Sequence, residues 1–449
     1  MRSKVRVGIF GSYDASSQGD LAILEGILAQ LVQRLPGSSA TVFAFAPAFI
    51  QRRLEGRFSE VEVVPGRPGH RSSPESASEA PRQTARKGFL AWAVRKGKGV
   101  ATRWSLLYDL YLLSRHWRFW VAQFRRVQSL DVLLIGGGGL VADLYPKWPI
   151  YPLLYVALAR LARTPVMFYA VGVGPLRRLR GKIYFTLALN LSHKVTVRDH
   201  RSFVRARKLL LDSRKLHQTA DPAFYLSAED LAVESQAVAL SFSHSQPRVG
   251  VSTVSLYRPG HWPVAAPELY ARYTQQMALL VAEMCNTFSA EVVLFSTNCP
   301  QDILTAQDIL QAALPRIQRG RAEVLSSCEL PVLSRLFPTL DAVVGTRMHS
   351  LILSAVYRVP CVALAYQEKV EALCESLNMA TFSFPIKRFL QQDDASAAGY
   401  RQEVLAKVRD ILRRPAYHRA LVETGVRGMR ACLDRDFQLL LDILQKPGD

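Results

Sequence analysis

An arginine and a histidine stand two residues apart where a buried strand gives way to an apolar helix. The segment DAVVGTRMHSLILSAV predicts a strand over 341–345 and a helix over 348–356, with Arg347 and His349 at the turn. A cation is unfavourable at the positive end of a helix unless an anion binds there too. The arginine fork suits a carboxylate or phosphate, and imidazole exchanges a proton near neutral pH. The alternative is that Arg347 pairs with a nearby acid and His349 caps a carbonyl.

Two further cations occupy comparable places. Arg198 ends the predicted strand 194–199, and Lys369 follows the predicted strand 360–366. Because ligands of open parallel sheets bind at the carboxyl ends of the strands, these cations are expected to converge on one cleft. The predicted ligand is a small anion with more than one charge.

Three glycine-rich turns also follow predicted strands, at 11–20, 136–143 and 172–177. Glycine allows a ligand to approach the backbone and leaves N–H groups free for anions. The candidate binding residues in these turns are Gly19, Asp20, Gly137, Gly138 and Asp143. None of the turns matches G-x-G-x-x-G well, and tight packing of helix on sheet is the alternative explanation for each.

The elements that must position these residues alternate between strand and helix. Apolar runs predict first-domain strands at 4–10, 39–46, 60–65, 131–136, 165–173 and 194–199, and second-domain strands at 248–256, 291–297, 341–346 and 360–366. This pattern favours an α/β protein of two Rossmann-like domains that face a cleft. We expect the domains at 1–228 and 236–420, followed by a helix at 421–449 that could cross back onto the first domain.

The formal charge of +20 is concentrated in one segment. Residues 81–130 hold eleven Lys or Arg and one acidic residue, with aromatic residues interleaved, in an insertion at about 65–130. Such a segment fits an anionic membrane surface, or else a packed helix pair with solvated cations. The longest apolar run, 148–159, is shorter than the ~20 residues that a membrane-spanning helix needs, so a soluble cytoplasmic protein is expected. Six scattered cysteines are expected to be reduced thiols.

Six segments, in order, resemble the polysaccharide pyruvyl transferase family. They are GIFGSYDASSQGDLAIL, DVLLIGGGGLVAD, YAVGVGPL, VTVRD, ADPAF and GTRMHSLILSAVYRVPCVALAYQEKVEAL. The chain departs from the family pattern at Ser17, Leu21, Val171 and His200.

The resemblance implies a glycosyltransferase-B-like fold and transfer of pyruvate from phosphoenolpyruvate to two sugar hydroxyls as a ketal. Such an enzyme would act in cell-surface or exopolysaccharide biosynthesis, on a sugar or a lipid-linked oligosaccharide. Arg347, Arg198 and Lys369 would then bind the donor, and His349 would be the general acid or base. Asp20 and Asp143 would orient sugar hydroxyls. No cofactor and no metal are expected, with phosphoenolpyruvate as the donor substrate.

Two other functions remain open at this point. A nucleotide-sugar-dependent glycosyltransferase would share the two-domain fold and the anion site. A non-catalytic protein that binds nucleic acid or a membrane surface through its basic segment would leave the cleft cations unexplained, so no nucleic acid partner is expected. For an enzyme, the same segment could hold the protein against the inner face of the membrane.

Overall fold

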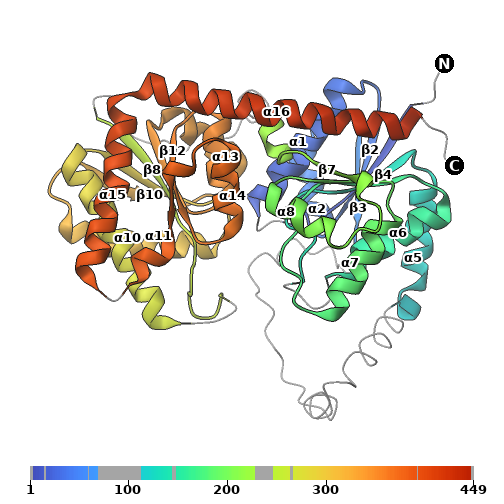
Figure 1. Cartoon of the computed structure of the whole chain (residues 1–449), viewed down its shortest axis with the longest axis horizontal. Coiled ribbons are helices and arrows are strands. Elements are labelled where there is room, and N and C mark those ends of the chain that lie inside the picture. The colour runs from blue at the N-terminus through green and yellow to red at the C-terminus, as the bar shows by residue number, and fades with distance from the viewer. Residues whose placement is uncertain are drawn as a thin grey trace, which may run out of the picture.

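The chain forms two α/β halves that are bridged by a long C-terminal helix (Figure 1). The computed structural model describes residues 4–14, 17–58, 60–68, 113–143, 148–227, 246–262, 266–391 and 393–445. Most of the basic insertion therefore lies outside the described residues, and with it most of the expected membrane-binding segment.

The N-terminal half is built on a seven-stranded parallel sheet in the order β3-β2-β1-β4-β5-β6-β7. Its strands are β1 (Arg6–Phe10), β2 (Ser39–Ala44), β3 (Val61–Pro65), β4 (Val132–Gly136), β5 (Val166–Val171), β6 (Lys194–Val197) and β7 (Leu216–Gln218). The strand order reverses between β1 and β4. In open parallel sheets this reversal is where the loops diverge and leave a crevice for a ligand.

The C-terminal half repeats this plan with six strands in the order β10-β9-β8-β11-β12-β13. Its strands are β8 (Arg248–Ser252), β9 (Glu291–Phe295), β10 (Arg321–Val324), β11 (Ala342–Gly345), β12 (Cys361–Ala365) and β13 (Ser383–Pro385). The order reverses between β8 and β11. Arg347 and His349 follow β11 directly, so they lie at this reversal point.

Helices cover both faces of the N-terminal sheet, because alternate strand residues point to opposite sides. Val7 and Ile9 of β1 belong to the core beneath α1, whereas Phe10 packs on the opposite face with Tyr155 and Phe185. The helices of this half are α1 (Gln18–Arg34), α2 (Pro47–Leu54), α5 (Trp117–Gln128), α6 (Ile150–Ala162), α7 (Leu179–Leu191) and α8 (His200–Arg207).

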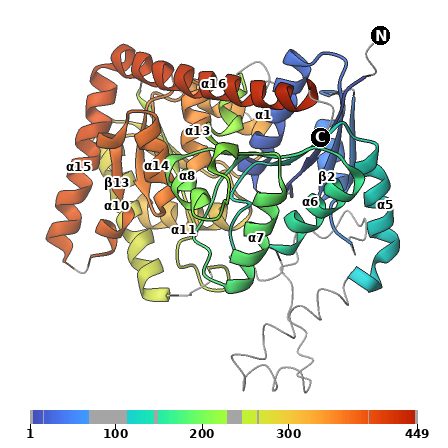
Figure 2. The same cartoon turned by 45° about the vertical axis from the view of Figure 1, so that its right-hand side comes forward.

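The C-terminal half ends in a helix that returns to the first half. Its helices are α10 (Pro267–Phe288), α11 (Gln301–Ala313), α12 (Leu330–Leu336), α13 (Met348–Val356), α14 (Glu368–Ser376), α15 (Asp394–Arg413) and α16 (Pro415–Gln445). The last of these, α16, contacts α13 and α15 and also β5 and the short helix η2 (Pro222–Tyr225) of the N-terminal half. Figures 1 and 2 show it running along one side of both halves. It starts at Pro415, earlier than the 421 expected from the sequence.

The predicted α/β architecture with two parallel sheets is confirmed. The expectation that all cysteines are reduced is wrong for one pair, because Cys299 and Cys328 form a disulfide with Cα atoms 6.1 Å apart. These cysteines follow the neighbouring strands β9 and β10. They are 29 residues apart in the chain, so the sequence does not show that they are in contact. Among the described residues, no helix is long and apolar enough to cross a membrane.

Candidate active site between the two halves

A buried cluster of Arg198, Asp221 and His349 joins the two halves. Arg198 follows β6, and its Nη1 donates a hydrogen bond of 2.6 Å to Oδ2 of Asp221, which caps η2. His349, in the first turn of α13, places Nε2 at 3.7 Å from the same oxygen. The carboxylate of Asp221 therefore lies between a fixed cation and a titratable ring.

The charge of Asp221 is set by these neighbours. Burial by itself would raise the pKa of Asp221, but His349 and the charge of Arg198 outweigh it and lower the pKa to about 2. Two buried nitrogens of the cluster, Nε of Arg198 and Nε2 of His349, have no hydrogen-bond partner among the described residues. An unsatisfied buried donor is costly, so Nε of Arg198 is available to a polar ligand, whereas Nε2 of His349 already faces the carboxylate of Asp221.

The N-terminus of α1 forms the opposite wall of the cluster. Ser17 caps this helix by accepting a hydrogen bond from the N–H of Asp20 at 3.2 Å. Gly19 packs so closely on the imidazole that a Cβ atom at this position would lie 2.0 Å from Nδ1 of His349. Gln18 fixes the helix to the C-terminal half, with its N–H donating to the carbonyl of Thr297 at 3.1 Å.

The carboxyl of Asp20 holds its proton more tightly than an ordinary aspartate does. Burial raises the pKa of Asp20, and Asp14 raises it further, while His349, Ser17 and Arg198 act in the opposite direction. Asp20 therefore differs from Asp221, which is strongly ionised. Two carboxyl groups with unlike proton affinities on either side of an imidazole form an arrangement that suits proton transfer.

The glycine turns after β4 and β5 border the same cluster. Gly137 and Gly138 have positive φ angles of 82° and 67°, which glycine adopts without strain. A Cβ atom on Gly138 would lie 2.6 Å from Oδ1 of Asp20, and one on Gly172 would lie 3.0 Å from the guanidinium of Arg198. Both turns therefore need glycine because the side chains of Asp20 and Arg198 press against their backbone.

Arg347 points away from His349, into the C-terminal half. Its Nε and Nη2 donate to the two carboxylate oxygens of Asp302, at 2.7 and 3.0 Å, and Nη1 donates to the hydroxyl of Tyr366 at 3.2 Å. Burial would lower the pKa of Arg347, but Tyr366 and Asp302 raise it, so the arginine stays charged. The expected alternative of an arginine paired with an acid thus describes this contact.

The remaining predicted residues lie apart from the cluster. Asp143 accepts a hydrogen bond from the backbone N–H of Arg178 at the start of α7 and is 4% exposed. Lys369 is exposed on the first turn of α14, and no hydrogen bond or ion pair of its side chain is seen within the described ranges. The structure thus brings together Gly19, Asp20, Gly138, Arg198 and His349, and it places Arg347, the N-cap residue of α13, against Asp302 and Tyr366.

Sequence reasoning missed Asp221 and Asp302. Asp221 stands in the ADPAF segment that contributed to the family resemblance, yet no role was assigned to it. Asp302 follows strand β9 in the first turn of α11, and it also accepts a hydrogen bond from the N–H of Ser255 at 2.8 Å. The signal that could have found it is an acidic residue just past a buried strand, the same signal that identified the cations.

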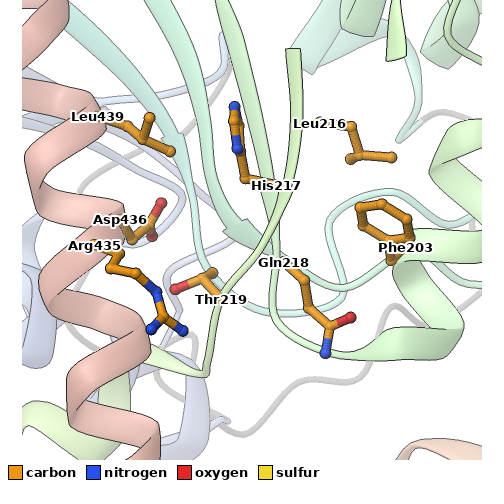
Figure 3. A pocket seen from close by; sticks show the side chains of 8 residues that line it. All are labelled: Phe203, Leu216, His217, Gln218, Thr219, Arg435, Asp436 and Leu439. Atoms are coloured by element: carbon orange, nitrogen blue, oxygen red, sulfur yellow. The ribbon is translucent and has the colours of Figure 1, made fainter. Parts of the chain in front are cut away.

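A separate cavity of about 420 Å³ lies beside the edge strand β7, and Figure 3 shows the side chains around it. It is lined by Phe203, Leu216, His217, Gln218, Thr219, Arg435, Asp436 and Leu439. It shares no residue with the cluster. In the part of the chain that the structure describes, no group of three or more His, Cys, Asp or Glu side chains is placed to hold a metal ion.

Several solved structures with this fold are named as UDP-GlcNAc 2-epimerases or were determined with UDP and a sugar. A putative UDP-N-acetylglucosamine 2-epimerase from Listeria monocytogenes superposes with a TM-score of 0.59 at 10% identity, covering 97% of each chain. The UDP-GlcNAc 2-epimerase of Neisseria meningitidis, bound to UDP-GlcNAc, superposes with a TM-score of 0.56 at 11% identity. The match covers 98% of this chain and 100% of the epimerase. Anabaena HepE in complex with UDP and glucose superposes with a TM-score of 0.56 at 11% identity. The match covers 98% of this chain and 99% of HepE. At these identities the likeness shows the fold alone, which is of the glycosyltransferase-B type.

No curated protein matches the chain in sequence. The model of one protein family, described as polysaccharide pyruvyl transferase, matches residues 19–368, which is well over half of the chain. This range begins at Gly19 and includes Asp221, Asp302 and His349. The chain therefore belongs to the polysaccharide pyruvyl transferase family.

Proposed function

We propose that the protein transfers pyruvate from phosphoenolpyruvate to two hydroxyls of a sugar, forming a cyclic ketal in cell-surface or exopolysaccharide biosynthesis. The observation that carries the proposal is the Arg198–Asp221–His349 cluster facing the α1 N-terminus, in a chain of this family. It combines an arginine with an unsatisfied donor, a titratable ring and a carboxyl of raised pKa.

The reaction needs a bound anion and a proton at the donor's methylene carbon. Protonation there leaves an oxocarbenium-like carbon that the first sugar hydroxyl attacks. Phosphate then departs, and the second hydroxyl closes the ring. Of the two hydroxyl protons, one balances the proton on the new methyl group and the other leaves with phosphate or water. His349 is the proposed proton donor, because it is the titratable ring at the junction of the two halves.

Arg198 is the proposed ligand for the carboxylate or phosphate of the donor. It already pairs with Asp221 through Nη1, while Nε is buried and unsatisfied. Asp20 is the proposed partner of a sugar hydroxyl, since its raised proton affinity suits exchange with that group. Arg347 and Lys369 remain proposed donor ligands, and each requires a rearrangement: Arg347 from its contact with Asp302, and Lys369 from solvent.

One observation favours a second candidate, a nucleotide-sugar-dependent transferase. The solved structures with this fold include complexes with UDP and UDP-sugars. The charged pair of Arg347 and Asp302, beside the carboxyl ends of β8, β9 and β11, could hold a diphosphate or a ribose. The two functions therefore differ in whether the donor binds at the Arg198–Asp221–His349 cluster or at the Arg347–Asp302 pair.

Thermal stability in the presence of each donor separates them. The melting temperature would be measured with phosphoenolpyruvate and with a set of UDP-sugars, on the wild type and on Arg198→Lys, which keeps the charge but loses the fork. A ligand at a hundred times its Kd stabilises the native state by about 2.7 kcal/mol. We expect phosphoenolpyruvate to stabilise the wild type and to lose most of this effect in Arg198→Lys.

The matched control is Arg214→Lys, at a surface arginine whose side chain is 91% exposed, and it should respond like the wild type. Stabilisation by a UDP-sugar and not by phosphoenolpyruvate would reject the proposed donor in favour of the second candidate. Equal stabilisation of the wild type and Arg198→Lys by phosphoenolpyruvate would reject the role of Arg198 but not the proposed donor.

A further inference from the structure

Helix α7 displays a line of exposed aliphatic side chains on the surface of the N-terminal half. Leu179, Ile183, Leu187 and Leu191 recur every four residues and are 62%, 47%, 47% and 40% exposed. The spacing places them along one side of the helix, while Tyr184, Phe185, Ala188 and Leu189 face the core. We call these four residues the apolar ridge.

The apolar ridge continues past the end of the helix. The backbone N–H of Leu211 donates to Oδ1 of Asn190 at 2.8 Å, which holds this loop beside the last turn of α7. Leu211 is 92% exposed. Exposed aliphatic residues are ordinary when they are scattered, but a continuous row of them indicates a binding surface.

Most charges near the apolar ridge in the sequence are positive, although Asp143 lies at the start of α7 and Asp212 follows Leu211. Residues 144–198 contain nine Lys or Arg and no acidic residue. Arg177, Arg178, Arg180 and Lys182 gather at the N-terminus of α7, where positive charge opposes the helix dipole. Arg178 donates from Nη1 to the carbonyl of Asp143, and the guanidinium of Arg180 lies over the ring of Tyr184. Arg177 and Lys182 are exposed beside the apolar ridge, where an anionic partner could bind them.

The charge pattern also discriminates between partners. A second copy of this chain would bring the same cations against each other in a symmetric contact, which costs energy. A basic helix with an apolar side instead matches an anionic bilayer, where aliphatic side chains enter the headgroup region and cations bind phosphates. In Figures 1 and 2, α7 lies on the side of the N-terminal half away from α16, so this contact leaves the crossing helix free.

We propose that α7 docks the protein on an anionic lipid bilayer, with the apolar ridge entering the interface and the exposed Arg177 and Lys182 contacting the headgroups. The residues of α7 lie outside the basic insertion in the sequence, and the inference does not depend on the reaction proposed above. It requires no spanning segment, because an interfacial helix lies in the plane of the membrane.

Vesicle sedimentation tests the proposal on the full chain. Vesicles of phosphatidylcholine with phosphatidylglycerol would be compared with vesicles of phosphatidylcholine alone, for the wild type and for Ile183→Gln/Leu187→Gln. The variant keeps the net charge, so any change reports the apolar contact and not electrostatic attraction to another basic segment. Because Gln replaces two apolar side chains that would enter the interface, we expect at least about tenfold weaker binding to the anionic vesicles.

The matched control is Leu269→Gln/Leu304→Gln, which removes two aliphatic side chains that are 37% and 40% exposed on α10 and α11. It should bind like the wild type. Arg177→Gln/Lys182→Gln should weaken binding to anionic vesicles only. Circular dichroism and the melting temperature would show that each variant is folded.

Three results would overturn the proposal. The wild type could fail to sediment with anionic vesicles, or the ridge variant could bind as well as the wild type, which would place lipid contact elsewhere in the chain. Light scattering could instead show a wild-type oligomer that the ridge variant dissociates while vesicle binding is unchanged. That outcome would make the apolar ridge an interface between copies.

Discussion

Asp221 organises the candidate active site at the scale of single residues. Its carboxylate binds Arg198 directly and lies 3.7 Å from His349, so one buried anion positions both groups. Because the pKa of Asp221 is near 2, this anion persists throughout the neutral range. In the proposed reaction, these charges would already be in place before substrate binds, which limits reorganisation of the site during the reaction.

Replacing His349 with Gln should remove the proton donor and leave the cluster in place. We expect acceptor-dependent phosphate release from phosphoenolpyruvate to fall by about 10²–10⁴, because general acid–base catalysis contributes that much. The melting temperature should change little, since the His349 side chain is 15% exposed and Gln can occupy its space. His200→Gln, at an exposed histidine that begins α8, is the control and should stay active. A fully active His349→Gln variant would eliminate the role of His349.

The individual elements show where sequence patterns are informative. The sequence predicted the interior strands β1, β4, β8 and β11 within a few residues, because buried strands of parallel sheets are continuous apolar runs. The three strands it missed, β7, β10 and β13, each lie at the edge of a sheet. Their sequences, LHQ, RAEV and SFP, are short and partly polar because one side of an edge strand has no neighbouring strand.

Helix α16 contains a buried acid, Asp436, that makes the free energy of unfolding depend on pH. Asp436 is 2% exposed, and burial raises its pKa to about 8, although Thr196 and Thr219 lower it in part. In the unfolded chain an aspartate titrates near pH 4. Between these values the folded protein keeps a proton that the unfolded chain loses, so the free energy of unfolding decreases as pH rises from about 4 to 8.

Asp436→Asn should abolish this part of the pH dependence, because the amide does not titrate. We expect the variant to melt at a higher temperature than the wild type at pH 8, with the difference shrinking as the pH approaches 4. Each kcal/mol of change in the free energy of unfolding shifts the melting temperature of a large domain by about 2–4 °C. Asp442→Asn, at an exposed position on the same helix, is the control. A difference between Asp436→Asn and the wild type that stays constant over this range would contradict the assignment.

At the scale of the whole molecule, three kinds of contact join the halves. Helix α16 packs on both, and Gln18 bonds the C-terminal half through its N–H and through its side-chain oxygen, which accepts from the N–H of Leu330 at 3.2 Å. Arg201 pairs with Glu371 and Glu375 between α8 and α14. Such partly exposed ion pairs contribute about 0–1 kcal/mol each, so packing holds the halves together more than charge does.

A donor bound between the halves should protect both of them at once. Hydrogen exchange with phosphoenolpyruvate present should slow at the α1 N-terminus around Gly19 and at the α13 N-terminus around His349. Peptides from the middle of α10, remote from the cluster, serve as the internal reference. Protection confined to the C-terminal half, near Asp302 and Arg347, would place the ligand at the Arg347–Asp302 pair.

The sequence by itself determined the α/β architecture, the strand-end positions of Arg198, Arg347 and His349, and the family. These follow from local patterns, since apolar runs and glycine turns record burial and turn geometry along the chain. Only the tertiary structure decided that Asp221 lies between Arg198 and His349. It also decided that Asp302 pairs with the guanidinium of Arg347 and that Cys299 forms a disulfide with Cys328. These partners lie 23 to 128 residues apart in the chain. Their proximity depends on how the two sheets are ordered and docked, which no local pattern encodes.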